Sequence, residues 1–242
     1  QSRLPERLTS VLRTLYLLFS EGYYSEGTHT IIRKECCFEA MSLTHLLLQN
    51  PHTHTHAVNS LMALMCFHAS RLEARQSANG TMILYADQDR GLWNTELIER
   101  GFYYLQQASR WQVTSNYYLE ASIAYWHTVD TDHLDKWKCI LDLYDALMIL
   151  DNSPMIALNR IVAFAKVHGN KQAIQEAEGL HRTPNHFYFV LLADLYTTVN
   201  TDQALRHFQS ALSLCKTEVE RAGIRKKISQ LSTGVADSGK EE

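Results

Sequence analysis

The stretch YADQDRGLWN (85–94) holds the residues of this chain best suited to chemistry. Asp87, Asp89 and Arg90 lie within four residues of each other, directly after an apolar patch and directly before Trp93. Two carboxylates and a guanidinium this close together can hold a metal ion, perform acid–base chemistry, dock a partner or fix a turn. A calcium loop is disfavoured, because its later glycine and bidentate glutamate are missing from their required places.

Two interpretations of this stretch remain, one structural and one functional. In the structural one, Asp89 or Asn94 caps the helix that follows, and Arg90 pairs with a carboxylate across the turn. In the functional one, the stretch docks a partner, since arginine and tryptophan are favoured anchors at protein interfaces. The candidate partner-binding residues are therefore Asp87, Gln88, Asp89, Arg90 and Trp93.

A second group of potential ligands is the run HTHTH (52–56). Its period of two would place His52, His54 and His56 on one face only in a strand, but Pro51 and the helix pattern that follows indicate a loop or a helix start. No carboxylate or cysteine nearby completes a set of metal ligands. We therefore interpret these histidines as polar surface residues and predict no metal site.

The adjacent cysteines Cys36 and Cys37 point about 100° apart on a helix. One is expected to be buried as a small apolar side chain and the other half-exposed, without redox chemistry. The sequence contains no glycine-rich phosphate loop, no HExxH and no GxSxG. We therefore predict no catalytic residues and no cofactor, and expect that the chain is not an enzyme.

Composition narrows the class of protein further. With 242 residues the chain can bury a core, and only 4 prolines and 10 glycines favour helices over a turn-rich β fold. A net charge of −3 lacks the basic surplus of a nucleic-acid-binding domain. Five cysteines without a CxxC pair suggest reduced thiols, and no apolar run is long enough for a membrane helix. These features predict a cytoplasmic protein with no membrane contact.

The apolar spacing predicts an all-α fold. In the first half, residues 1–132, apolar residues recur at helical intervals in five segments, and the polar stretch DQDR lies in a loop between the third and fourth. Asn79-Gly80 predicts a turn just before that loop. The expected helices cover residues 4–22, 30–49, 54–76, 95–108 and 115–128.

The second half shows an internal repeat. HGNKQAI (168–174) and VNTDQAL (199–205) align at an offset of 31 residues, and each lies between two helical patterns. A helix–turn–helix unit that repeats near 34 residues is typical of tetratricopeptide repeats, and the offset of 31 is close to it, so a helical array of that kind is predicted for residues 133–231. Small side chains would let the paired helices pack closely. They are Ala163, Ala173, Ala193 and Ala204.

Residues 232–242, which lack apolar anchors, are expected to form a disordered tail.

Five segments together resemble a known arrangement, the C-terminal extension of a group of bacterial extracytoplasmic-function sigma factors of RNA polymerase. The likeness covers about residues 4–231 in the same order, and its QDR-x-x-W and SPxxALNR elements are the most specific. Ser20 stands where that group tends to have Asn, and Gly91 where Ser is usual, which removes a hydroxyl cap. The segments are LYLLFSEGYY (15–24), RKECCFEAMSLTHLL (33–47), ALMCFHASR (63–71), LYADQDRGLWN (84–94) and SPMIALNRIVA (153–163).

The resemblance implies a regulatory or protein-interaction module acting in transcription initiation. In a full-length factor the domains that grip polymerase and read the promoter come upstream, so this chain, which begins with Gln1, is expected to be a fragment without them. The implied partners are the sigma factor's own DNA-binding domains, the RNA polymerase core or a signalling protein, and DNA is reached only through the missing domains. The alternative is a helical enzyme or small-ligand-binding domain that uses the DQDR loop.

Overall fold

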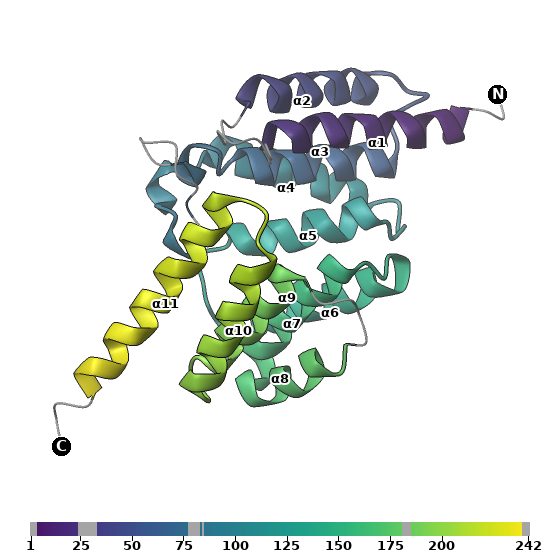
Figure 1. Cartoon of the computed structure of the whole chain (residues 1–242). Coiled ribbons are helices and arrows are strands. Elements are labelled where there is room, and N and C mark those ends of the chain that lie inside the picture. The colour runs from purple at the N-terminus through teal and green to yellow at the C-terminus, as the bar shows by residue number, and fades with distance from the viewer. Residues whose placement is uncertain (1–3, 24–32, 77–82, 84, 181–184, 239–242) are drawn as a thin grey trace. The chain divides into compact units, whose positions relative to one another are not determined.

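The computed structural model describes residues 4–23, 33–76, 83, 85–180 and 185–238 (Figure 1). Within these ranges the chain forms α-helices, short 3-10 helices and no strand, which confirms the all-α prediction. The chain divides into two units, Gln1–Thr131 and Asp132–Glu242, and each is described by itself below.

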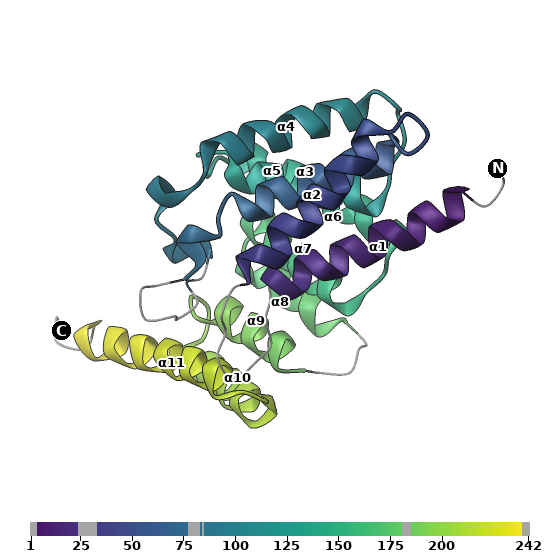
Figure 2. The same ribbon diagram turned by 90° about the horizontal axis from the view of Figure 1, so that it is seen from above.

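The first unit is organised around one central helix. Helix α3 contacts all four of the other α-helices of the unit, as Figure 1 and Figure 2 show from two directions. Its sequence HAVNSLMALMCFHA is apolar on nearly every side, and such a helix must be surrounded to be stable in water. The helices are α1 (Leu4–Tyr23), α2 (Lys34–Gln49), α3 (His56–Ala69), α4 (Thr95–Ser109) and α5 (Asn116–Thr128), with 3-10 helices at Glu73–Arg75, Tyr85–Asp87 and Arg90–Leu92.

The third helix is shorter than its sequence pattern predicts. It ends at Ala69 instead of continuing to residue 76, and a 3-10 turn follows it. The carbonyl of Ser70 accepts a hydrogen bond from the backbone N–H of Asn94 at 2.8 Å, so a tertiary contact replaces the helical bond that would have continued α3. The predicted turn at Asn79-Gly80 and the predicted start of the second helix at residues 30–32 lie outside the described residues.

The second unit is a succession of helices in which each packs on the next, and α7 also contacts α9. The four small residues expected between paired helices, Ala163, Ala173, Ala193 and Ala204, are all buried. The two aligned turn segments begin α8 and α10, at Asn170 and Thr201, which keeps the offset of 31 residues (201 − 170). The tetratricopeptide-like character of the array stays a prediction. The helices are α6 (Leu134–Leu150), α7 (Pro154–His168), α8 (Asn170–Glu178), α9 (His186–Tyr196), α10 (Thr201–Leu214) and α11 (Glu218–Ser238).

Arg160 joins three helices of the second unit. Its guanidinium on α7 pairs with Asp145 on α6 and with Glu176 on α8, and its side chain is only 21% exposed. Two carboxylates around a largely buried guanidinium compensate its desolvation. This arginine belongs to the SPMIALNR segment, which therefore has a structural role here.

Helix α11 extends into the segment that was predicted to be a disordered tail. It continues to Ser238, so residues 232–238 are helical where the sequence predicted a disordered tail. Once a helix is nucleated, each added residue gains one backbone hydrogen bond, and a polar stretch without proline can extend it. Residues 239–242 lie outside the described part. Among the described residues no helix is both long and apolar enough to cross a membrane.

Candidate functional site

The DQDR loop is held by its own polar side chains. The Asp89 carboxylate accepts a hydrogen bond from the backbone N–H of Gly91 at 2.8 Å and so caps the short helix Arg90–Leu92. Asn94, and not Asp89, caps α4, with its side-chain oxygen 3.0 Å from the N–H of Leu97. The structural interpretation named Asp89 or Asn94 as the cap of α4. Asn94 is the cap because it directly precedes the first turn of that helix.

Arg90 ties the loop to the end of the first unit. Its guanidinium donates to the carboxylate of Asp130 at 2.6 Å, so its partner lies 40 residues further along the chain and not across the turn. Asp130 is 90% exposed, and an exposed pair of this kind contributes roughly 0–1 kcal/mol to stability. The guanidinium of Arg90 also lies 5.1 Å from the centre of the Trp93 ring.

Trp93 is the buried anchor of the loop, at 7% exposure. A second guanidinium, that of Arg71, lies 5.8 Å from its ring, and the ring of Tyr85 lies 6.0 Å away. Cation–π contacts of this kind each contribute roughly 0.5–2 kcal/mol, with the larger values at desolvated sites. The tryptophan is therefore held in place by two arginines from different parts of the chain.

Segments far apart in the sequence meet at Arg71. Its guanidinium donates to the hydroxyl of Tyr23 at 3.3 Å and lies 5.3 Å from the centre of the Tyr85 ring. The ring of His68 lies 5.0 Å from that of Tyr23, and the ring of His127 lies 5.1 Å from that of Tyr85. We call this group the Arg71 cluster. Its members are Tyr23, His68, Arg71, Arg75, Tyr85, Trp93 and His127.

The Arg71 cluster is rich in positive charge. Arg75 is 8% exposed, and its guanidinium lies over the ring of Tyr23 at 3.7 Å from the ring centre. The pKa of His68 is held well below its ordinary value of 6.5, first by burial and then by the charges of Arg71, Arg75 and His127. His68 is therefore neutral at physiological pH, and the arginines carry the charge of the cluster.

The five predicted partner-binding residues fall into three groups. Trp93 belongs to the Arg71 cluster, and the guanidinium of Arg90 contacts its ring. Gln88 supports the loop, since its amide donates to the carbonyl of Ile83 at 3.2 Å. Asp87 and Asp89 are exposed. The alternative function required these two carboxylates to line a pocket, whereas both lie at the surface.

Sequence spacing did not point to Tyr23, His68 or Arg71 as site residues. Each sits in a segment that resembles the sigma-factor extension, LFSEGYY or FHASR, but nothing local in those segments suggests chemistry. Arg71 and Tyr23 are 48 residues apart, and only the fold brings them together. The sequence feature that could have indicated this site is Arg71, which follows His68 by three residues at the end of a strongly apolar helix.

The prediction for HTHTH was wrong for one of its residues. His52 and His54 are exposed, but His56 is buried. One nitrogen of its ring lies 3.1 Å from the carbonyl oxygen of Ala108, and the other lies 3.0 Å from the hydroxyl of Ser115, so it joins α3 to the end of α4 and the start of α5. A buried imidazole needs such partners, and both come from distant sequence.

The cysteine pair packs as expected, with Cys37 buried and Cys36 half-exposed. The thiol of Cys37 lies 3.5 Å from the carbonyl oxygen of Phe19. Burial, reinforced by Cys36, raises the pKa of the Cys37 thiol to about 11, so the reactive thiolate is suppressed.

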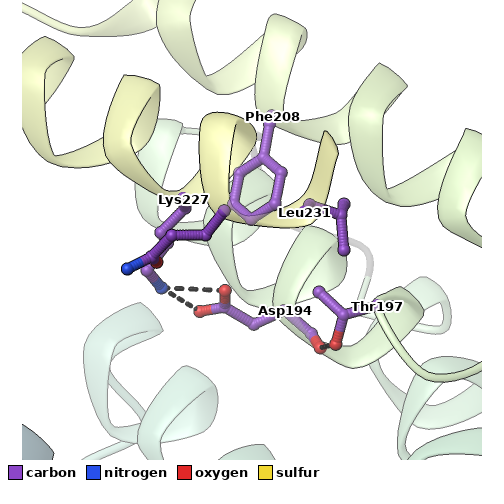
Figure 3. Close-up of a pocket in the computed structure, with 6 residues that line it drawn as sticks. Asp194, Thr197, Phe208, Lys227 and Leu231 are labelled. Carbon is purple, nitrogen blue, oxygen red and sulfur yellow. Dashed lines mark hydrogen bonds and ion pairs between the residues drawn. The ribbon is translucent and has the colours of Figure 1, made fainter. Parts of the chain in front are cut away.

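A cavity of about 370 Å³ lies in the second unit, between α9, α10 and α11 (Figure 3). The ammonium group of Lys227 points at the carboxylate of Asp194, with its nitrogen 2.8 and 2.5 Å from the two oxygens. Because the charges of Lys227 and Asp194 neutralise each other, we interpret this cavity as the place where their ion pair joins α11 to α9. Its lining residues are Asp194, Thr197, Phe208, Lys227, Gln230 and Leu231.

Removing the cap of α4 should have a measurable cost. We expect Asn94→Ala to lower the free energy of unfolding by about 1 kcal/mol, because the N–H of Leu97 loses its side-chain acceptor. Chemical denaturation monitored by circular dichroism measures this difference. Asn94→Asp keeps an acceptor oxygen at the cap and should stay within about 0.5 kcal/mol of the unmodified chain; an equal loss in both variants would contradict the assignment.

Protonation of His68 should destabilise the fold in acid. Because its pKa is lowered in the folded state, its contribution to stability is present above pH 6.5 and is lost as the pH falls below that value. Lowering the pH from 7.5 to 5.5 should cost on the order of 1 kcal/mol through this group alone. His68→Phe keeps a ring and removes the titration, so its free energy of unfolding should fall less over the same range. Identical pH profiles for the two proteins would exclude a buried neutral His68.

Comparisons with known proteins cover both units. Residues 7–109 match a family described as "Family of unknown function (DUF6596)", and this range contains the whole Arg71 cluster except His127. The chain is also 32% identical over 241 residues to "Uncharacterized protein R00370" of Rhizobium meliloti (strain 1021). That alignment covers 98% of this chain and 57% of the relative, so the chain spans little more than half of the relative's length. No solved structure matches the chain significantly.

Proposed function

We propose that this chain is the C-terminal regulatory and protein-interaction module of an extracytoplasmic-function sigma factor. The observation that carries the proposal is the convergence of three of the five resembling segments on the Arg71 cluster. Tyr23 comes from the first of them, His68 and Arg71 from the third, and Trp93 from the DQDR segment. Motifs that are separated in sequence but meet at one place indicate a shared role at that place.

The length of the Rhizobium meliloti relative is compatible with the proposal. The alignment leaves 43% of that protein uncovered (100 − 57), and promoter-binding domains of a sigma factor would fit within it. The net charge of −3 also agrees, because in the proposed arrangement DNA contacts belong to those other domains and this module contacts protein.

In the proposed mechanism the module docks on the sigma factor's own DNA-binding domains, on RNA polymerase or on a signalling protein. The DQDR loop offers an exposed carboxylate at Asp87 and an arginine, Arg90, whose ion-pair partner Asp130 is itself exposed. Large apolar side chains on α1 and α2 are also exposed. They are Val11, Leu17, Phe38 and Leu46.

A transcription assay from a cognate promoter tests the proposal. The full-length protein that carries this chain is compared with a version truncated before about Leu4, using purified RNA polymerase. We expect transcription to be lost while the promoter-binding part remains folded. Unchanged transcription would show that the module is dispensable, and increased transcription would show that it inhibits.

Within the same assay, the double variant Asp89→Ala, Arg90→Ala tests the DQDR loop itself. It removes the cap of the Arg90–Leu92 turn and the link to Asp130, both of which lie at the surface. We expect reduced transcription with little change in stability, since each exposed interaction contributes roughly 1 kcal/mol or less. Unchanged transcription and unchanged folding would remove the loop from the proposal.

A further inference from the structure

The charge of Arg71 lacks an anionic partner among the described residues. Its guanidinium makes one hydrogen bond, 3.3 Å long, to the uncharged hydroxyl of Tyr23. The remaining contacts are to the faces of Tyr85 and Trp93. A half-buried guanidinium has five N–H donors and is usually paired with a carboxylate, because desolvating an uncompensated charge is costly.

The aromatic rings hold this guanidinium in a defined orientation. Tyr85 and Trp93 lie 5.3 and 5.8 Å from its central carbon, and Tyr23 fixes one of its terminal nitrogens. A guanidinium immobilised on aromatic faces presents its remaining N–H groups as a rigid, planar fork. That fork matches the two oxygens of a carboxylate, and little conformational entropy is lost when such a group binds.

Two more buried polar atoms of the Arg71 cluster have no hydrogen-bond partner in the described part of the chain. They are Nε1 of Trp93 and Nδ1 of His68. The indole nitrogen can only donate, and the Nδ1 of a neutral imidazole donates in one of its two tautomers. Unsatisfied donors beside an unpaired cation favour an acceptor that carries negative charge.

The carboxylates of the DQDR loop and of Asp130, which pairs with it, do not fill this role. Asp89 is engaged by the N–H of Gly91, and Asp130 is engaged by Arg90. Asp87 is exposed and pairs with neither Arg71 nor Arg90. None of these three carboxylates therefore compensates the charge of Arg71 within the described part of the chain.

We propose that the Arg71 cluster is a carboxylate-binding site that receives the side chain of an aspartate or glutamate from the protein segment that docks there. This inference rests on the proposed docking function and names the group that the docked segment must present. A carboxylate carries the single negative charge that balances Arg71, and its planar shape fits the fork. Arg71 and the indole N–H of Trp93 then bind the acidic group, and Tyr23 and Tyr85 keep Arg71 in position.

The unmodified chain can test this by nuclear magnetic resonance. The chain has 4 tryptophans, so its indole N–H region contains few signals, and Trp93→Phe identifies that of Trp93. Sodium acetate is titrated at pH 7.5 against sodium chloride of equal ionic strength. We expect acetate, and not chloride, to shift the Trp93 indole signal with saturation while the other three indole signals stay in place. Equal responses to acetate and chloride would overturn the proposal.

Variants then assign the binding to Arg71. Arg71→Gln should raise the half-saturation concentration for acetate at least tenfold, and Arg71→Lys, which keeps the charge but not the fork, should give an intermediate value. Arg100→Gln is the matched control, since Arg100 is an exposed arginine of the same unit paired with Glu96 on its own helix. It should bind acetate as the unmodified chain does. Undiminished binding in a folded Arg71→Gln chain would overturn the assignment.

Peptide probes separate a protein-borne carboxylate from a free one. A short capped peptide with one central glutamate should shift the Trp93 signal at a lower concentration than acetate, and the same peptide with glutamine should not. A response to acetate but not to the glutamate peptide would overturn the protein-borne form of the proposal. If none of these probes binds and truncation still abolishes transcription, the carboxylate site fails and the docking function stands. If they bind and truncation leaves transcription unchanged, the docking function fails.

Discussion

Replacing Trp93 by alanine should lower the free energy of unfolding of the first unit by about 3–5 kcal/mol. The indole is 7% exposed and contacts the guanidinium groups of Arg71 and Arg90 and the ring of Tyr85. Its removal leaves a cavity and exposes the Arg71 cluster to water. Urea denaturation followed by circular dichroism measures the change.

Trp111→Ala is the control for this loss. Trp111 belongs to the same unit but is 43% exposed, so truncating it removes much less buried surface. We expect a change below about 1 kcal/mol. If the two tryptophan variants are equally stable, Trp93 is not the anchor of the DQDR loop.

Replacing Gly22 by alanine should cost about 3 kcal/mol, near the upper end for overpacking. A β-carbon at this position would lie 2.6 Å from the carbonyl oxygen of Arg33 and 2.9 Å from the backbone nitrogen of Cys37. Because both are backbone atoms, no side-chain rotation relieves the clash, and the start of α2 must move away from α1. Thermal denaturation of the first unit measures the loss.

Gly223→Ala tests the same chemical change where there is space. This glycine lies in α11, and no atom lies within 4 Å of the added β-carbon. Alanine should therefore stabilise that helix by about 0.5–1 kcal/mol, the usual difference in helix propensity. A loss at Gly223 as large as that at Gly22 would show that steric contact is not the cause.

Much of the helical architecture follows from local sequence. Helices α4 and α5 begin and end within one or two residues of the predicted limits, because Asn94 and Ser115 cap them and the apolar spacing continues through them. The end of α3 was not predictable in this way. It depends on the hydrogen bond from the N–H of Asn94 to the carbonyl of Ser70, and no local sequence pattern indicates that contact.

The candidate site was predictable only in part, for the same physical reason. The DQDR loop stands out because its charged residues are neighbours in sequence. Tyr23 and His68 are ordinary residues of two helices, and Arg71 lies in the turn after the second, until packing brings their side chains together. His56 shows the same limit, since the two partners that make it a buried residue lie 52 and 59 residues away.

The most direct test of the account combines the Arg71 cluster with the proposed activity. Transcription from a cognate promoter is measured with purified polymerase and the full-length protein, carrying either Arg71→Gln or the control Arg100→Gln. We expect Arg71→Gln to lower transcription at least tenfold while circular dichroism shows an intact fold, and Arg100→Gln to leave transcription unchanged. Equal transcription by the two variants would contradict a functional role for the Arg71 cluster.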